Sequence, residues 1–208
     1  GTPWHLTPGS VEALDQRGWR RNTLIIFSSD NGGPQPGVVT SNGPLRAGKA
    51  TLYEGGVRVA AFANWEGQIK PGQIVNQPLH IADWYPTLLK LAGASLEQKL
   101  PLDGRDAWPT ITEGQPSPHN EILHNATPQN GAIRVGDWKL VINGEVRDNG
   151  AGGAARAQRR NNNANRETGG ESFELFNLAD DPYEKENLAT RHPDKVKELR
   201  ARYEVFAK

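Results

Sequence analysis

The apolar positions of this 208-residue chain fall into short runs, separated by stretches rich in glycine and proline. Leu24–Ser29 opens with four consecutive apolar residues, a pattern typical of a buried strand. Val57–Trp65 is apolar, has alternating β-branched residues at its start, and predicts a second buried strand. The intervening residues 30–56 are rich in glycine and proline, which predicts a loop.

Capping residues and apolar spacing predict three helices. Ser10 is placed to cap a helix from Val11 to about Gly18. Asp83–Ala92 begins with a capping aspartate, carries leucines on one face and is followed by a glycine, as expected at a helix C-terminus. His192–Lys208 has the amphipathic pattern of a terminal helix. Residues 100–115 indicate a loop with a short helical turn.

The C-terminal part predicts a small antiparallel sheet. Glu121–His124, Ala132–Val135 and Trp138–Ile142 have the length and composition of strands, and Gly136-Asp137 predicts a hairpin turn between the last two. Phe173–Leu178 predicts a further strand. Residues 143–172 lose nearly all apolar character, so we expect a mobile loop there.

These elements predict an α/β fold in two parts. Residues 1–120 are expected to form a mostly parallel or mixed sheet with flanking helices. Residues 121–208 are expected to form the small antiparallel sheet with its terminal helix.

Composition excludes several classes of function. Lys and Arg number 24, as do Asp and Glu, so the net charge is zero; without a basic stripe, nucleic-acid binding is not expected. The chain has no Cys, which excludes disulfides, thiolate metal sites and a cysteine nucleophile. No apolar run is long enough to span a membrane, and no signal-peptide pattern is visible, which leaves the cellular location open.

The candidate chemistry lies where the first strand ends. Open α/β sheets bind ligands just beyond the carboxyl ends of their strands. Asp30 and Asn31 offer hard oxygens there, of the kind that suit Ca²⁺ or Mg²⁺. Lys49 follows Gly48, where the backbone can approach an anion closely, and would neutralise a sulfate or phosphate oxygen. The alternative interpretations are a turn that only caps the strand and an ordinary surface lysine.

Other polar residues are weaker candidates. His80 and His124 are candidates for polar contacts in a cleft, or for structural roles; His5, on an N-terminal arm, is a candidate acid or base. Glu54 is expected to be structural, either paired with Arg58 or capping a turn.

Seven motifs follow one another along the chain: Leu24–Gly32, Pro44–Lys49, Tyr53–Val59, His80–Leu89, Leu102–Gly104, Ala132–Leu140 and Glu174–Leu188. Together they resemble the C-terminal part of the sulfatase family, within the alkaline-phosphatase superfamily. The resemblance covers residues 11–205. It implies a partial alkaline-phosphatase-like fold, Asp30 and Asn31 as ligands of a divalent metal, most consistently Ca²⁺, and Lys49 as a catalytic, sulfate-contacting lysine with Arg46 beside it.

The resemblance also implies a nucleophile that this sequence does not show. Sulfatases carry a C/S-x-P-x-R motif whose first residue becomes formylglycine. Asn42–Arg46 fits the spacing, but asparagine stands at the nucleophile position, and the segment already forms the lysine turn. We therefore expect a truncated sulfatase-like protein.

Two classes of function follow. The chain is expected to retain part of a metal- and ester-binding site, with at most weak metal-assisted hydrolysis of sulfate or phosphate esters. The alternative is a non-catalytic scaffold that self-associates or pairs with a missing N-terminal half. The apolar strand at residues 24–27 needs neighbours on both edges, so we expect a homo-oligomer.

Overall fold

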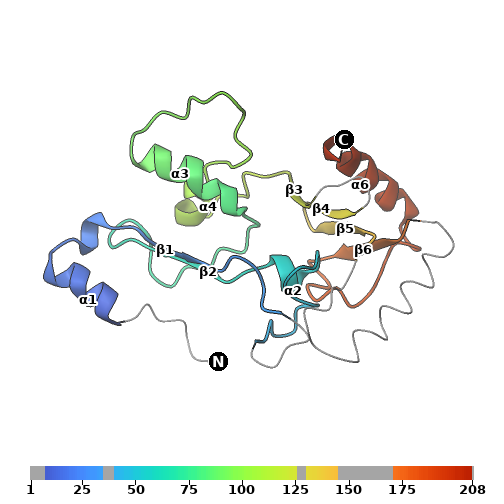
Figure 1. Ribbon diagram of the computed structural model, residues 1–208, viewed down its shortest axis with the longest axis horizontal. Helices are drawn as coiled ribbons and strands as arrows, with labels where there is room; N and C mark the ends of the chain where they lie inside the picture. Colours follow the sequence, from blue (N-terminus) through green and yellow to red (C-terminus); the bar gives the residue numbers. More distant parts are fainter. Residues whose placement is uncertain (1–7, 35–39, 126–129, 145–170, 208) are drawn as a thin grey trace. The chain divides into compact units, whose positions relative to one another are not determined.

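The computed structural model describes residues 8–34, 40–125, 130–144 and 171–207 (Figure 1). Most of the predicted mobile loop 143–172, and His5, lie outside these residues. The chain divides into two compact units, residues 1–28 with 61–119 and residues 29–60 with 120–208. Each unit is described by itself.

The first unit pairs two short strands and carries most of the helices. Its elements are α1 (Pro8–Gln16), η1 (Arg20–Asn22), β1 (Ile25–Ser28), β2 (Ala61–Asn64), η2 (Ile81–Asp83), α3 (Trp84–Leu91) and α4 (Trp108–Glu113). β1 and β2 lie side by side (Figure 1) and run antiparallel. Phe27 pairs with Phe62 across the two strands, and their rings stack 5.1 Å apart. The expected mixed sheet is represented, among the described residues, by this antiparallel pair.

The start of α3 is fixed by a reciprocal pair of hydrogen bonds. His80 Nδ1 accepts the Ala82 N–H at 3.1 Å, and Asp83 Oδ2 accepts the His80 N–H at 2.7 Å. Asp83 also contacts His119 Nε2 at 2.6 Å and accepts the Arg105 N–H at 2.9 Å. Asp83 therefore caps the preceding 3₁₀ turn instead of α3, and His80 has a structural role.

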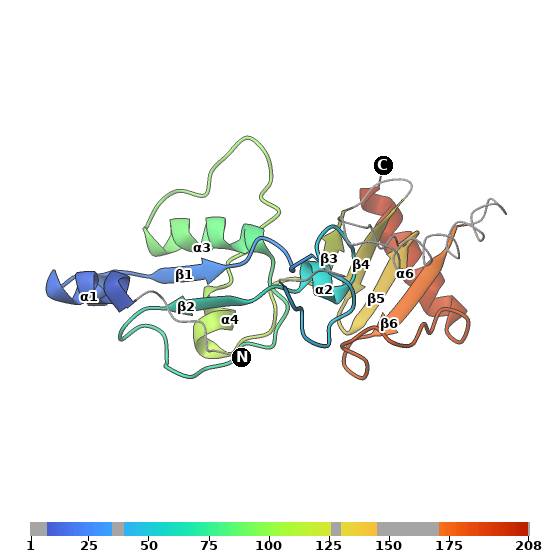
Figure 2. The same cartoon turned by 60° about the horizontal axis from the view of Figure 1, so that its bottom comes forward.

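The second unit is built on a four-stranded antiparallel sheet. Its elements are α2 (Glu54–Val57), β3 (Glu121–His124), β4 (Gly131–Val135), β5 (Trp138–Ile142), β6 (Phe173–Asn177) and α6 (Pro193–Phe206), with strand order β3-β4-β5-β6. Figure 2 shows the four strands side by side with α6 along them. The predicted strands and the hairpin turn at Gly136-Asp137 are all present.

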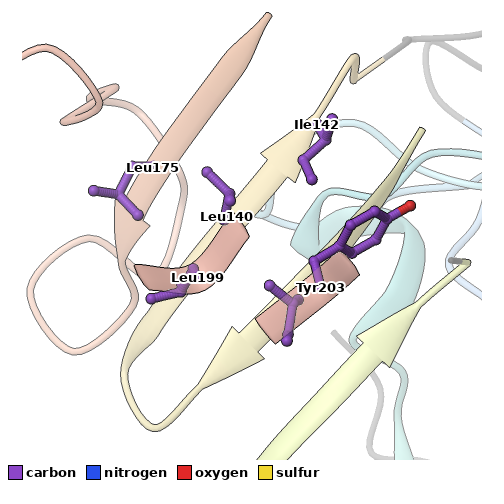
Figure 3. Close-up of a cluster of buried hydrophobic side chains, with 6 residues drawn as sticks. Leu140, Ile142, Leu175, Leu199 and Tyr203 are labelled. Atoms are coloured by element: carbon purple, nitrogen blue, oxygen red, sulfur yellow. The ribbon is translucent and has the colours of Figure 1, made fainter. Parts of the chain in front are cut away.

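Strand alternation gives this sheet two buried faces, since successive side chains point to opposite sides. One face packs on α6: Leu140 and Ile142 of β5 lie with Leu175, Leu199 and Tyr203 in the main core (Figure 3). The opposite face carries a second cluster, made by Tyr53, Ala132, Val141, Phe176 and Leu178. The loop that contains Lys49 therefore packs against the sheet through Tyr53.

The predicted α/β class is confirmed, with local differences at the element ends. The strand predicted at Val57–Trp65 shortens to β2, since Val57 is the last residue of the helical turn α2 and residues 58–60 and Trp65 belong to neither a helix nor a strand. The first helix begins at Pro8, before the expected cap Ser10. Within the described ranges, no helix is both long and apolar enough to cross a membrane.

Candidate anion and metal site

The turn after β1 holds the two predicted metal ligands at the surface. Asp30 is exposed and Asn31 is half-buried. The Asn31 side-chain amide donates to Asp30 Oδ1 at 3.3 Å and to the Gly32 carbonyl at 3.1 Å, and Ser29 Oγ donates to the Asn31 carbonyl at 2.8 Å. The two neighbouring side chains are thereby held in a defined turn.

The lysine turn is hydrogen-bonded to this same segment. The Lys49 N–H donates to the Gly33 carbonyl at 3.1 Å. Asn42 links both sides: its Oδ1 accepts the Gly33 N–H at 2.8 Å, and its Nδ2 donates to the Gly33 and Ala47 carbonyls, each at 2.9 Å. The side chain of Asn42, at the apparent nucleophile position, therefore has a structural role: it links the segment at Gly33 to the lysine turn at Ala47.

Two glycines let α2 pack backbone to backbone against both segments. Gly32 donates to the Gly56 carbonyl at 2.9 Å, and a Cβ on Gly32 would lie 1.7 Å from the Gly55 carbonyl oxygen. A Cβ on Gly55 would lie 2.2 Å from the Ala47 carbonyl oxygen. No side chain fits at either position, so the glycines bring the Asp30 turn and the Lys49 turn into one assembly.

Backbone strain is concentrated beside the lysine. Ala47 and Ala50 have φ values of 57° and 66°, in the left-handed region that costs a residue with a Cβ about 1 kcal/mol or more. The Gly48 carbonyl accepts from Thr51 Oγ1 at 2.7 Å and from the Thr51 N–H at 3.1 Å. These bonds, with those of Asn42, stabilise the strained turn.

Arg46 is engaged in anchoring the turn to the sheet. Its guanidinium donates to Glu174 Oε1 at 2.8 Å and to the Glu184 carbonyl at 3.2 Å, and lies 3.9 Å from the centroid of the Tyr53 ring. The Tyr53 hydroxyl donates to the other Glu174 oxygen. Burial raises the pKa of Tyr53, and the nearby Glu174 carboxylate raises it further, so the phenol stays a neutral donor. A direct role of Arg46 in substrate binding stays a prediction.

A buried lysine joins α2 to the sheet. Lys139 of β5 is fully buried, and its Nζ lies 2.9 Å from Glu54 Oε1 and 2.8 Å from Glu184 Oε1. Glu54 and Glu184 are also buried, with 3% and 1% exposure. Glu184 Oε1 has no hydrogen-bond partner in the described structure. Its contact with Lys139 is therefore counted as an ion pair only. The partner of Glu54 is thus Lys139, where the sequence suggested Arg58.

The two carboxylates respond to this environment in opposite directions. Burial acts to raise the pKa of Glu54, but the Lys139 ammonium, assisted by Arg134 and His124, holds it below its usual range. Burial raises the pKa of Glu184 above its usual range, and the negative charge of Glu54 adds to the rise against the attraction of Lys139. Glu54 is therefore the principal counter-ion of the lysine.

The donor chemistry at Asp30 and Asn31 fits a hard cation, but their number is small. Ca²⁺ takes six to eight oxygen ligands in most protein sites. Within the described part of the chain, no three His, Asp or Glu side chains gather as a metal site requires. Metal binding by Asp30 and Asn31 therefore stays a prediction.

Sequence reasoning found the segments of this site but missed its supports. Asn42 resembled a misplaced nucleophile. Glu174 and Glu184 stand in the seventh motif, but nothing in that motif indicated their contacts with Arg46 and Lys139. Lys139 did give a local signal, since a lysine inside the apolar run 138–142 requires a buried counter-charge. The sequence could not identify the partner, because Glu54 lies 85 residues from Lys139.

Replacing Lys139 by methionine should strongly destabilise the chain. The change keeps the buried volume but leaves two buried carboxylates without a cation, which costs about 3–5 kcal/mol. Urea denaturation at pH 7 measures the loss. The matched control is Lys195→Met on α6, whose lysine pairs with Glu198 at the surface and should change stability by less than about 1 kcal/mol. Equal effects of the two changes would contradict the role given to Lys139.

Neutralising the two buried glutamates should have opposite pH dependence. The lowered pKa of Glu54 means that its ionised form stabilises the fold above the pKa of the unfolded chain, and that this stability is lost as pH falls. The raised pKa of Glu184 means the reverse: stability present at acidic pH is lost as pH rises through the folded-state pKa.

Relative to the parent chain, Glu54→Gln should therefore become more destabilising between pH 4 and pH 8. Glu184→Gln should become less destabilising, or stabilising, over the same range. Urea denaturation of both variants at several pH values measures this. Parallel pH trends for the two variants would refute the assignment of opposite pKa shifts.

Comparison with known proteins identifies the relatives of this chain. A family model described as Sulfatase matches residues 8–94. Arylsulfatase J of Mus musculus is 38% identical over 220 residues, covering 94% of this chain and 37% of that protein. Steryl-sulfatase of Mus musculus is 38% identical over 132 residues, covering 60% of this chain and 21% of that protein.

Solved structures agree with the sequence relatives. The crystal structure of Ps i-CgsB matches with a TM-score of 0.73 and 29% identity, covering 95% of this chain and 39% of that one. The PsFucS1 sulfatase from Pseudoalteromonas sp. matches with a TM-score of 0.72 and 25% identity, again over 95% and 39%. The chain spans well under half the length of these proteins. The resemblance inferred from the motifs is confirmed, and the chain is a relative of the sulfatases.

Proposed function

We propose that residues 30–56 form one wall of a sulfate-ester site, in which Lys49 and Arg46 bind the anionic group and Asp30 and Asn31 bind Ca²⁺. The hydrogen bond from the Lys49 N–H to the Gly33 carbonyl carries this proposal, because it ties the lysine turn to the segment that follows the two oxygen ligands. The proposal also rests on kinship with sulfatases, whose named members act on sulfate esters.

The proposed residues have complementary chemical roles. The Lys49 ammonium would neutralise an ester oxygen as a point charge. A divalent cation beside Asp30 would stabilise the negative charge that develops on the transferred group. The rigid backbone assembly around Gly32 and Gly55 would hold these groups without reorganisation. Binding is the first function of such a wall, and weak hydrolysis of activated sulfate or phosphate esters is the second.

Sulfate and calcium binding should depend on Lys49 and Asp30 respectively. Lys49→Ala removes a charge-assisted contact and should weaken sulfate binding by roughly tenfold or more. Asp30→Ala should abolish calcium binding, since it removes the only carboxylate of the pair. Isothermal titration calorimetry with sodium sulfate and with calcium chloride measures both, and aryl sulfates and aryl phosphates test for turnover that falls in Lys49→Ala.

The controls are exposed residues of the same types. Lys197→Ala and Asp194→Ala alter side chains on α6 that are 80% and 96% exposed, and should leave both titrations unchanged. If the parent chain binds neither sulfate nor calcium and hydrolyses no ester, the alternative scaffold function is correct.

We also propose that the chain self-associates through its first unit. The side chains of Ile81, Tyr85 and Leu88 follow one another at helical spacing along η2 and α3, and are 63%, 55% and 41% exposed. A two-stranded sheet is marginally stable alone in water, and β1 is only half-buried along its length. Covering this apolar row would supply the burial that the unit lacks.

The double change Ile81→Ser with Leu88→Ser should shift the chain from oligomer to monomer. Multi-angle light scattering over a range of concentrations measures this, with Val205→Ser, an exposed apolar position on α6, as the control. A parent chain that is monomeric at high concentration would rule out self-association.

A further inference from the structure

We propose that Glu184 is a positioning residue of the Lys49 turn, because it forms hydrogen bonds with both ends of the segment 46–54, although it lies 130 residues after Glu54 in the sequence. The proposal deepens the proposed function and rests on it, because Lys49 is the group that Glu184 would position.

Two separate bonds attach Glu184 to this segment. At one end, its backbone carbonyl accepts from Arg46 Nη1 at 3.2 Å. At the other end, its side-chain Oε2 accepts the Glu54 N–H at 2.6 Å. Lys49 lies between these two attachment points. A single residue therefore fixes the separation of the two ends of the strained lysine turn.

The backbone of Glu184 is itself strained and held in place. Its φ is 54°, in the left-handed region that a residue with a Cβ adopts only at a cost. The Glu184 N–H donates to the Asp181 carbonyl at 3.2 Å, and Asp181 Oδ2 accepts the N–H groups of Lys185 and Glu186 at 2.6 and 2.9 Å. This turn directs the carboxylate of Glu184 inward, where its exposure is 1%. Strain that the surroundings maintain in this way is typical of functional sites.

Lys139 compensates the negative charge of the buried Glu184 carboxylate through one of its two oxygens. Lys139 Nζ lies 2.8 Å from Glu184 Oε1, while Oε2 is the atom that accepts from Glu54. The lysine simultaneously pairs with the Glu54 side chain at 2.9 Å. The charge is therefore compensated on one oxygen, and the other remains available to hold the start of α2.

If Glu184 only stabilised the fold, its loss would speed amide hydrogen exchange throughout the second unit. If Glu184 positions the lysine turn, its loss should speed amide exchange mainly in that turn. Three amide hydrogen bonds report on the turn: Lys49 N–H to Gly33, Gly55 N–H to Arg46, and Gly56 N–H to Tyr53. The amides of the β5–β6 ladder report on the sheet.

The experiment compares amide hydrogen exchange by NMR in Glu184→Asn, Glu184→Gly and Glu184→Gln, together with sulfate titration. Asparagine and glycine both accept the left-handed backbone, but neither side chain reaches the Glu54 N–H. Glutamine keeps the reach and the acceptor oxygen. Glu186→Gln is the matched control, since Glu186 is exposed and pairs with Arg191.

We expect exchange at the three turn amides to quicken by roughly 10- to 100-fold in the asparagine and glycine variants, the loss expected for one charge-assisted hydrogen bond. Exchange in the β5–β6 ladder should stay within a few-fold of the parent chain. Glutamine should restore part of the protection of the turn, because it keeps the acceptor oxygen but not the charge, and sulfate affinity should follow the same order.

The proposal would be overturned by uniform quickening of exchange across turn and sheet, by no change at the turn, or by failure of both short variants to fold while Glu184→Gln folds. Sulfate binding that is equal in the parent and Glu184→Gly would do so as well. If the parent chain binds no sulfate, the proposed function fails, and the exchange pattern alone then decides whether Glu184 holds the turn.

Discussion

The second unit depends on one buried cation. Placing the Lys139 ammonium in the interior costs several kcal/mol of lost hydration, so it must be repaid by well-placed carboxylates. Glu54 and Glu184 meet that requirement from two distant parts of the sequence. Because the lysine pairs with both, with Glu54 as its principal counter-ion, the contact favours one way of folding the loop 29–60 onto the sheet. Apolar packing alone would tolerate several such arrangements.

Side chains alternate between the two faces of the sheet along β5 and β6, so one face is apolar and the other carries polar contacts. Leu140 and Leu175 face α6 and build an apolar core. Their neighbours Lys139 and Glu174 face the opposite way and carry the polar contacts to α2 and Arg46. A one-residue slip in register would exchange these faces, placing charges under α6 and leucines under the lysine turn. The geometry of the candidate site therefore depends on the register of the sheet.

The sequence was sufficient for what depends on local pattern and insufficient for what depends on distant contacts. The hairpin at Gly136-Asp137 and the helix α3 follow from turn chemistry and apolar spacing, and both were predicted. Asp30 and Lys49 could be proposed as site residues because each stands in a local motif, and their roles stay predictions. The partners of Lys139 were not, because a buried ion pair is specified by three-dimensional proximity. The short helix α2 was missed because two glycines usually indicate a loop, and here they permit close backbone packing instead.

Rigidity around Lys49 bears on what such a wall could do by itself. The proposed lysine and two oxygen ligands would give little binding energy, so affinity would depend on how little order must be created when a ligand arrives. The turn is already fixed by Asn42, by close glycine contacts and by its attachments to the sheet, and it retains two strained alanines in one conformation. Most of the ordering cost is thus met by folding. Because these supports hold the backbone of the turn before a ligand arrives, the proposed contacts of Lys49 and Asp30 would depend on the supports as well as on the number of ligands that the turn presents.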